Sequence, residues 1–265
     1  MKADLKPAEY LLNYLNVVPG TLEAVYEHIA STGRITLKQC RQDLFFRAEG
    51  DSATDHVLEA LNFLVATDLL EWDGTEYWAP PGPLKPFAFR ALLLQGLSAQ
   101  TDRQADFMRI YELLVRTGTI GITVDRLMAF LNEQQFKTVG NVSINDLKLG
   151  FWMRLLDFIG VLHQVRGAKS VNLTPDCRLM NQILEEAAGG AELVRAGDYL
   201  ELIECQYFPV VTGTGDLHPG VAAAVVEMNE QGLIGFTAMS DAKPIRFSPT
   251  MTASHLLIKE AGADA

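Results

Sequence analysis

Hydrophobic and polar positions follow two different periods along this chain, and one order of these periods recurs. In the first third, apolar residues at helical spacing predict one apolar helix face, formed by Val57, Leu58, Leu61, Leu64 and Val65. Two short aromatic stretches follow, on either side of Asp73-Gly74, a dipeptide that favours the left-handed dihedral angles of a tight turn. The pattern therefore predicts a helix and then a β-hairpin, and the prolines between positions 80 and 83 predict a linker.

The same order occurs twice more. Residues 153–176 predict a helix, a strand, a glycine-containing turn at 166–169 and a second strand. Residues 225–249 repeat the order, with a turn at 240–243 and a strand at 245–247. Each hairpin follows a helix directly, and a proline comes soon after each one.

Two further helices are expected before each helix–hairpin pair. In the first repeat they cover residues 22–31 and 36–44, and in the second they cover 102–116 and 123–133. Thr123 is the predicted N-cap of the last of these, because its hydroxyl can accept a hydrogen bond from a free backbone N–H.

The last third of the chain fits the order less well. Residues 191–204 are expected to be its first helix, and the Pro- and Gly-rich segment 207–220 leaves little room for a second. Residues 176–187 are expected to form a connecting helix, and 254–261 a C-terminal helix.

Helix, short strand, helix, helix and two-stranded wing is the element order of the winged-helix domain, and the chain resembles that superfamily in tandem. The resemblance implies a mainly α fold with small β-hairpin wings, of the α+β class. It implies a first unit at 1–84 with an N-terminal helix and a second, the most basic, at 85–175. The connecting helix and a degenerate third unit would occupy 176–265.

The aromatic residues of the first hairpin have two interpretations. A three-helix unit has a small core, so the inward side chains of a wing are expected to cover it. Trp72, Tyr77 and Trp78 are therefore interpreted first as core residues. The alternative is an exposed aromatic patch that contacts a partner.

Charge restricts where nucleic acid could bind. The chain of 265 residues carries a net charge of −11, which disfavours non-specific attraction to phosphates or to anionic lipid. Residues 1–84 hold 6 Lys/Arg and 13 Asp/Glu, residues 85–175 hold 11 and 7, and residues 176–265 hold 5 and 13. Any contact with nucleic acid is therefore expected in the middle third.

Targeting and redox features point to a reduced interior compartment. No apolar run approaches the roughly 20 residues of a transmembrane helix, and the N-terminal residues lack the apolar stretch of a signal peptide. The three cysteines, Cys40, Cys177 and Cys205, are too far apart for a CxxC metal site and odd in number. We expect a cytoplasmic protein without a membrane partner.

In winged-helix proteins that read DNA sequence, the outward face of the third helix carries the residues that reach base edges. In the first unit that face includes two acidic residues and no basic one: Ser52, Asp55, Glu59, Phe63 and Ala66. In the third unit it is formed by Ala223, Val226 and Glu230. Neither face suits a phosphate backbone.

The third helix of the middle unit has an apolar outward face. Its inward stripe is predicted to be Ile144, Leu147, Phe151 and Leu155. The opposite face would then contain Asp146, Leu149, Gly150, Met153 and Asp157, with Trp152 extending the apolar surface. Such a face suits a protein interface, and burial against a neighbouring unit of the same chain is the alternative.

No catalytic, cofactor or metal motif supports an enzyme. The five histidines lack HExxH or HxH spacing, and no serine lies in a GxSxG context. The glycines of segment 210–220 lack the Gly-Lys-Ser/Thr of a phosphate-binding loop. We expect a non-enzymatic protein with no cofactor and no metal, although a site in the last third of the chain stays open.

Two hypotheses follow. The first is a tandem winged-helix adaptor within a larger, DNA-associated complex, which binds a protein partner or itself through Phe63, Leu149, Trp152 and Met153. In architecture it resembles the acidic tandem winged-helix subunits that attach to kleisins in chromosome-organising complexes. The second is a DNA-binding transcriptional regulator that contacts the DNA backbone weakly through Lys148, Arg154, Arg166 and Lys169.

Overall fold

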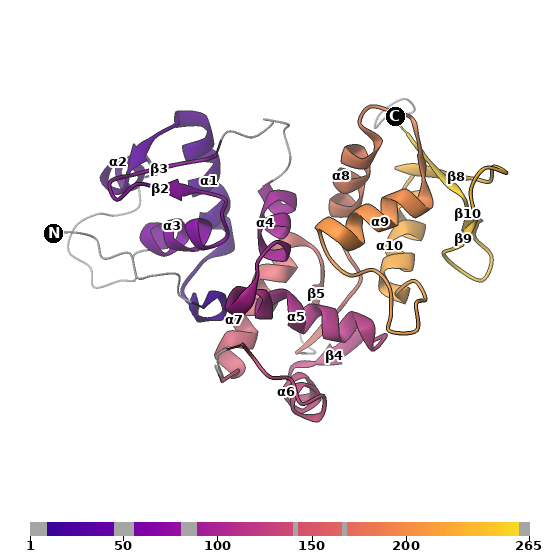
Figure 1. The fold of residues 1–265 in the computed structure, drawn as a ribbon, viewed down its shortest axis with the longest axis horizontal. Coiled ribbons are helices and arrows are strands. Elements are labelled where there is room, and N and C mark those ends of the chain that lie inside the picture. Colours follow the sequence, from indigo (N-terminus) through magenta and orange to yellow (C-terminus); the bar gives the residue numbers. More distant parts are fainter. Residues whose placement is uncertain (1–9, 45–55, 81–88, 140–142, 166–168, 260–265) are drawn as a thin grey trace. The chain divides into compact units, whose positions relative to one another are not determined.

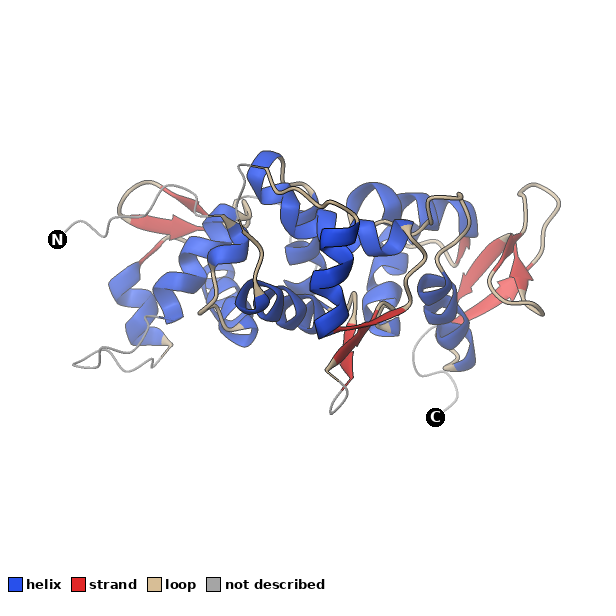
Figure 2. Cartoon of the chain, turned by 90° about the horizontal axis from the view of Figure 1, so that it is seen from below, coloured by secondary structure: helices blue, strands red, loops and turns tan. Residues whose placement is uncertain are grey.

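The fold is mainly helical, with small antiparallel sheets, and belongs to the α+β class (Figures 1 and 2). The computed structural model describes residues 10–44, 56–80, 89–139, 143–165 and 169–259. They divide into two compact units, of which unit 1 comprises 1–107 and 137–158, and unit 2 comprises 108–136 and 159–265. The chain thus changes units three times, and each unit combines segments that are distant in sequence.

Unit 1 contains one small sheet and several short helices. Its elements, in chain order, are η1 (Leu11–Asn13), α1 (Pro19–Thr32), β1 (Ile35–Thr36), α2 (Leu37–Asp43), α3 (His56–Ala66), β2 (Glu71–Trp72), β3 (Glu76–Trp78) and α4 (Phe89–Ser98). The beginning of α5 (Asp102–Arg116) and most of α7 (Asp146–Ile159) complete it.

Local sequence explains how these elements begin and end. Pro19 is tolerated at the start of α1, where its missing N–H has no helical partner. Thr36 caps α2 through a capping box, in which its hydroxyl accepts from Gln39 N and the Gln39 side chain accepts from Thr36 N. Gly74, with φ +101°, allows the tight turn between β2 and β3, as the Asp-Gly dipeptide predicts.

The core of unit 1 is aromatic. Phe63 of α3 makes edge-to-face contacts with Tyr14 and with Phe151 of α7, at centroid distances of 5.3 and 6.0 Å. Phe151 also packs on Phe107, and the indole N–H of Trp152 donates to Phe107 O at 2.8 Å. Ring pairs of this geometry contribute roughly 0.5–1.5 kcal/mol each beyond the area they bury.

Unit 2 contains the remaining elements. After the rest of α5 they are β4 (Gly121–Thr123), α6 (Val124–Glu133), β5 (His163–Val165), β6 (Ser170–Asn172), α8 (Cys177–Ala188), β7 (Leu193–Arg195), α9 (Ala196–Gln206), α10 (Pro219–Glu230), β8 (Ile234–Thr237), β9 (Ile245–Arg246), β10 (Thr252–Ala253) and β11 (His255–Ile258). Helices α8, α9 and α10 pack together, and the hydroxyl of the buried Tyr199 donates to Met180 O at 2.7 Å.

Three sheets share one strand order. The order is β1-β3-β2 in unit 1, and β4-β6-β5 and β7-β11-β8 in unit 2, so the last strand in sequence is always central. All neighbouring strands are antiparallel, with Ile122 opposite Val171 and Leu256 opposite both Val194 and Phe236. A helix, a strand and two more helices precede the last two strands of each sheet along the chain.

Several predicted elements are confirmed. Helix α5 has the predicted bounds, and α6 begins after Thr123, whose hydroxyl accepts from Arg126 N at 3.4 Å. Strands β5 and β6 form the predicted antiparallel pair, although most of the turn between them lies outside the described residues. Residues 1–9, Ser52 and Asp55 also lie outside them, and the N-terminal part that is described contains only a 3₁₀ turn, η1.

Two predictions for the last third were wrong, and one helix was confirmed. Residues 191–204 do not form one helix, because β7 occupies their first part and α9 begins at Ala196. The helix predicted at 176–187 is confirmed as α8, and two helices, α9 and α10, follow it. The expected C-terminal helix is instead the central strand β11, whose pairing with β7 and β8 could not be seen locally.

The predicted hairpin of the last third has a different pairing. Strand β8 pairs with β11, whereas β9, the predicted strand at 245–247, pairs with β10. The predicted domain boundaries after residues 84 and 175 stay a prediction. The two compact units divide the chain elsewhere, within α5, after α6 and at the end of α7.

Candidate protein-interaction groove

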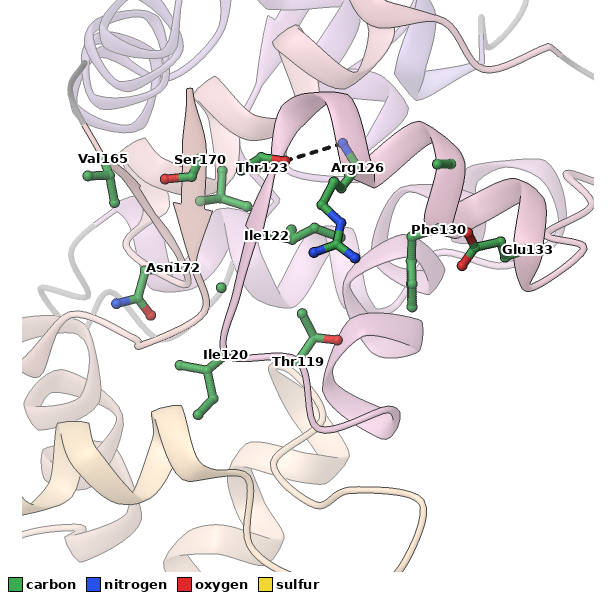
Figure 3. A pocket seen from close by; sticks show the side chains of 13 residues that line it. Thr119, Ile120, Ile122, Thr123, Arg126, Phe130, Glu133, Val165, Ser170 and Asn172 are labelled. Atoms are coloured by element: carbon green, nitrogen blue, oxygen red, sulfur yellow. Dashed lines mark hydrogen bonds between the residues drawn. The ribbon is translucent and has the colours of Figure 1, made fainter. Parts of the chain in front are cut away.

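A groove of about 530 Å³ opens between helix α6 and the sheet β4-β6-β5 in unit 2 (Figure 3). Strand β4 leads directly into α6, so the two elements form adjacent walls of the groove. The lining residues are Thr119, Ile120, Gly121, Ile122, Thr123, Arg126, Ala129, Phe130, Glu133, Val165, Ser170, Val171 and Asn172. We name this site the α6 groove.

Helix α6 supplies the charged wall because it is amphipathic. Leu127 and Leu131 are buried, which places the positions 126, 129, 130 and 133 on another face at i, i+3, i+4 and i+7 spacing. Figure 3 shows the side chains of Arg126 and Phe130 extending from the same side of the helix. We call Arg126, Ala129, Phe130 and Glu133 the α6 stripe.

The rim of the α6 groove exposes aliphatic side chains. Ile120, just before β4, and Val165, at the end of β5, are each 46% exposed. Val171 of the central strand is buried and forms part of the floor. Aliphatic residues that line a concave surface together, with polar groups at its edge, are typical of an interaction site.

The two charges of the α6 stripe have no partner among the residues that the structure describes. Neither the guanidinium of Arg126 nor the carboxylate of Glu133 forms a hydrogen bond or an ion pair there. Seven residues of helix separate them by roughly 10 Å along the axis, which is too far for the two to pair with each other. Both charges are therefore available to a second molecule.

Helix α10 anchors one end of the sheet below the groove. Gly220 N–H donates to His218 Nδ1 at 3.2 Å, so the proton of the neutral ring lies on Nε2, which donates to Thr119 O at 3.0 Å. Burial lowers the pKa of His218, and the bond to Thr119 opposes that shift only in part. The histidine is thus held neutral, between the N-terminus of α10 and Thr119, two residues before β4.

A second close approach fixes the same end of the sheet, where the start of β4 lies beside the end of β6. A Cβ atom on Gly220 would lie 2.2 Å from Leu173 O, directly after β6, so only glycine fits at this position. Arg116 and Glu204 pair nearby and bind the segment at 210–213, where Arg116 also donates to Val211 O at 2.8 Å. These contacts hold the groove on a rigid base.

The chemistry of the groove suits binding. Arg126 and Glu133 are the ionisable residues among those that line it, and the remaining lining is aliphatic, aromatic or of the hydroxyl and amide types. Such a lining offers apolar contact together with one positive and one negative charge. It offers no nucleophile beside a base.

The structure contradicts the predicted interface. Phe63, Leu149 and Trp152 are fully buried and Met153 is 6% exposed, so these four residues cannot form an exposed surface. Replacement of Leu149 and Met153 by Asp would place charge in a core and unfold it, not merely remove a partner contact. The physical reason is that α7 is apolar on most of its circumference, so spacing alone could not select its exposed face.

One member of the predicted inward stripe of α7 is in fact exposed. Leu147 has 69% of its surface exposed, whereas Phe151 and Leu155 of the same stripe are buried. Leu147 lies in the first turn of α7, which precedes the buried part of the helix. It offers an exposed apolar residue that does not line the α6 groove.

The predicted DNA-contacting residues are only partly available. Lys148 donates to Ser143 O at 2.7 Å, and burial lowers the pKa of its ammonium group. Arg154 is exposed, but it donates to Leu15 O at 3.1 Å. Lys169 is exposed beside β6, and Arg166 lies outside the described residues. Two of the four predicted contacts, Lys148 and Arg154, are therefore already bonded to backbone carbonyls within unit 1.

A serine, a histidine and an aspartate lie close together at β11 without forming an accessible site. Ser254 Oγ is 2.9 Å from His255 Nδ1, and His255 Nε2 is 3.6 Å from Asp241 Oδ2. Ser254 is 1% exposed, and its hydroxyl already accepts a hydrogen bond from Met239 N at 2.8 Å. A substrate could not reach this oxygen, so we interpret the cluster as a structural contact.

The glycine-rich segment at 210–220 is also structural. Gly213 N donates to Arg116 O, Thr212 N to Asp216 O and Gly215 N to Thr212 O, at 2.7–3.0 Å. A phosphate-binding loop needs free backbone N–H groups. Here they are already used within the protein.

Within the described ranges, no group of three or more His, Cys, Asp or Glu side chains is arranged to hold a metal ion. In the same ranges, no helix combines the length and the apolar character that a membrane crossing requires. Comparisons with protein-family models, with curated proteins and with solved structures found no match for this chain.

Sequence reasoning missed the α6 groove. The α6 stripe could have been found, because Thr123 marks the start of the helix and its outward positions follow from a period of 3.6. Ile120 and Val165 could not have been joined to it, since they are 45 positions apart and meet only through the sheet.

Proposed function

We propose that the chain is a non-enzymatic tandem winged-helix adaptor, a subunit that binds other proteins within a larger, DNA-associated complex. The threefold order of helix, strand, helix, helix and two strands supports the winged-helix part of this proposal. The shared strand order of the three sheets, with the last strand central, supports it further. The adaptor part depends on surface chemistry.

The observation that carries the proposal is the lack of usable positive charge on the helices that would read DNA. Helices α3 and α10 contain no Lys or Arg. On α7, the side chains of Lys148 and Arg154 are already bonded to backbone carbonyls. Phosphate contacts dominate the affinity of proteins for DNA, so helices of this kind suit protein partners better.

The α6 groove is the surface that we assign to protein binding. Its exposed aliphatic rim offers apolar area, and its two charges, unpaired within the described residues, can orient a partner. Replacement of Ile120 by Asp puts a charge on this rim, and the fold should tolerate it because 46% of the side chain is already exposed. Leu147→Asp is the matched control, since Leu147 is more exposed and lies outside the groove.

Capture from an extract of the source cell tests this assignment. Tagged wild type, Ile120→Asp and Leu147→Asp would be compared by quantitative mass spectrometry, after urea unfolding has shown that all three are equally folded. We expect proteins that wild type and Leu147→Asp retain and that Ile120→Asp loses. Equal capture by all three variants would remove the groove from the proposal.

Binding to DNA tests the alternative function. Fluorescence anisotropy with a random duplex should be measured at low salt, because electrostatic attraction to DNA is strongest there. We expect no binding at micromolar protein. A tight, salt-sensitive signal that Arg166→Glu/Lys169→Glu removes would favour a DNA-binding regulator instead. We test this alternative because residues 85–175 carry a positive net charge.

A further inference from the structure

The α6 stripe is complementary to itself. Its four residues, Arg126, Ala129, Phe130 and Glu133, are placed symmetrically about the midpoint between 129 and 130. If two copies of α6 lie antiparallel, Arg126 of each copy faces Glu133 of the other. At the centre, Phe130 of each copy faces Ala129 of the other.

Both charges of the stripe are available to a second molecule. Neither is paired within the described part of the chain, and they are too far apart along the helix to pair with each other. One partner that presents a carboxylate and a guanidinium at the same spacing, in reverse order, satisfies both. A second copy of the chain meets this requirement without further assumptions.

The apolar centre of the stripe suits close helix packing. Ala129 is exposed and small, and Phe130 is half-buried, so a large side chain of one copy would pack over a small side chain of the other. Ile120 and Val165 line the groove beside the stripe and offer more apolar area to the second copy.

We propose that the chain forms a two-fold symmetric homodimer through the α6 stripe, with two Arg126–Glu133 ion pairs between the copies. This inference rests on the proposed protein-binding function, because it names a second copy of the chain as one partner. The contact is isologous, because the same surface of each copy forms the interface and every residue pair occurs twice.

The interface is expected to be weak. A stable interface buries about 800 Å² on each partner, and one face of a helix with 10 residues supplies less than that. We therefore expect a monomer–dimer equilibrium with a dissociation constant in the micromolar range. Low ionic strength should strengthen the dimer because both ion pairs are exposed.

Charge reversal provides the test. Sedimentation of the full chain, across micromolar concentrations at low salt, would be compared for wild type, Arg126→Glu and Glu133→Arg. Each single variant replaces both ion pairs of its homodimer by like charges, so its dissociation constant should rise about tenfold. An equimolar mixture of the two variants should dimerise as well as wild type, because opposite charges face each other again at both positions.

Controls separate the stripe from general charge effects. Arg178→Glu on α8 and Glu201→Arg on α9 change exposed residues outside the groove and should dimerise like wild type. Ala129→Arg should weaken the dimer without restoration by either charge variant, since it fills the small central position. The heterodimer would be shown directly if tagged Arg126→Glu retains untagged Glu133→Arg. Neither tagged variant should retain its own untagged form.

The possible results decide between the two proposals. A monomeric wild type over this range, or a mixture that fails to restore dimerisation, would overturn the homodimer. If such a monomer still captures proteins through Ile120, the adaptor function stands and only the dimer fails. A chain that neither dimerises nor captures a protein would overturn both.

Discussion

The sheets β1-β3-β2 and β4-β6-β5 have the same strand order but different surfaces. In the first, Tyr77 of the central strand is 2% exposed and stacks with Trp72 at 6.2 Å. In the second, Val171 of the central strand is also buried, but exposed Ile120 and Val165 and the α6 stripe border an open groove above it. Topology alone therefore does not decide whether a sheet is closed by its own side chains or left for a partner.

The arginines beside the two sheets differ in the same way. Arg34 donates to Asp73 at 2.9 Å, and its guanidinium lies 3.8 Å from the centre of the Trp78 ring. Arg126 has no such contact within the described residues. A paired arginine contributes to local structure, whereas an unpaired arginine on a groove wall is available for binding.

The two sheets also obtain their rigidity from different sources. The first is supported by aromatic residues on its own strands, while the second is anchored at one end by His218 and Gly220 of the α10 N-terminus. An external anchor leaves the surface of the sheet free. This difference makes specific predictions about stability.

The largest expected effect is that of Tyr77→Ala. Loss of a buried aromatic ring should lower the free energy of unfolding by roughly 3–5 kcal/mol, since it combines lost burial with a cavity. Val165→Ala, in the open sheet, should change it by no more than about 0.5 kcal/mol because that side chain is largely exposed. Urea unfolding measures both, and similar losses would contradict the contrast between the sheets.

Gly220→Ala should have the next largest effect. Alanine favours a helix over glycine by about 1 kcal/mol, but its Cβ would clash with Leu173 O, and overpacking of this kind costs about 1–3 kcal/mol. The clash should prevail and destabilise the protein. Gly197→Ala in α9 is the control, because no atom lies within 4 Å of its added Cβ, and it should be neutral or stabilising.

His218→Asn should change the dependence of stability on pH. Burial lowers the pKa of His218 in the folded protein, so the unfolded chain binds more protons as pH falls below about 6.5 and wild type loses stability there. Above that pH the contribution of His218 to the free energy of unfolding does not change with pH. Asparagine can still cap α10, so His218→Asn should lower the free energy of unfolding by about 1 kcal/mol at neutral pH. The variant should not lose further stability through this position as the pH falls.

The measurement is the difference in unfolding free energy between wild type and His218→Asn at several pH values. The difference should narrow as pH falls, because only wild type has the buried imidazole that resists protonation. A difference that is independent of pH would contradict the neutral, anchored state of His218.

The smallest expected effect distinguishes the two arginines. Arg34→Ala should destabilise the protein by about 0.5 kcal/mol through loss of its cation–π contact with Trp78. Arg126→Ala should leave stability unchanged and weaken self-association, since its guanidinium has no partner in the described chain. A loss of stability from Arg126→Ala would show that this arginine is structural.

Local features of the fold could be predicted from the sequence. Asp73-Gly74 predicted a tight hairpin, Thr123 predicted the start of α6, and apolar spacing predicted α5 with its observed bounds. Each of these depends on residues within a few positions of one another. The winged-helix interpretation of the repeated order stays a proposal.

Predictions that needed a distant partner failed. The strand β11 was expected to be a helix, since its four residues show no period that separates the two states. Phe63 was expected on an outward face, but Tyr14 and Phe151 cover it. No prediction covered α4, which follows the proline-rich segment.

The candidate site also combines features that the local sequence predicts with features that need distant residues. The charges and the spacing of the α6 stripe lie within eight consecutive residues, 126–133. The groove beside it depends on Ile120 and Val165, which come together only when β6 pairs with both β4 and β5.

The sequence by itself determined where helices and hairpins begin and end, because caps, turns and periodicity act over a few residues. The tertiary structure decided which apolar faces are buried, which strands pair and which arginine has no partner among the described residues. The physical reason is that spacing reveals an apolar face but not what covers it. That depends on contacts between residues far apart in the chain.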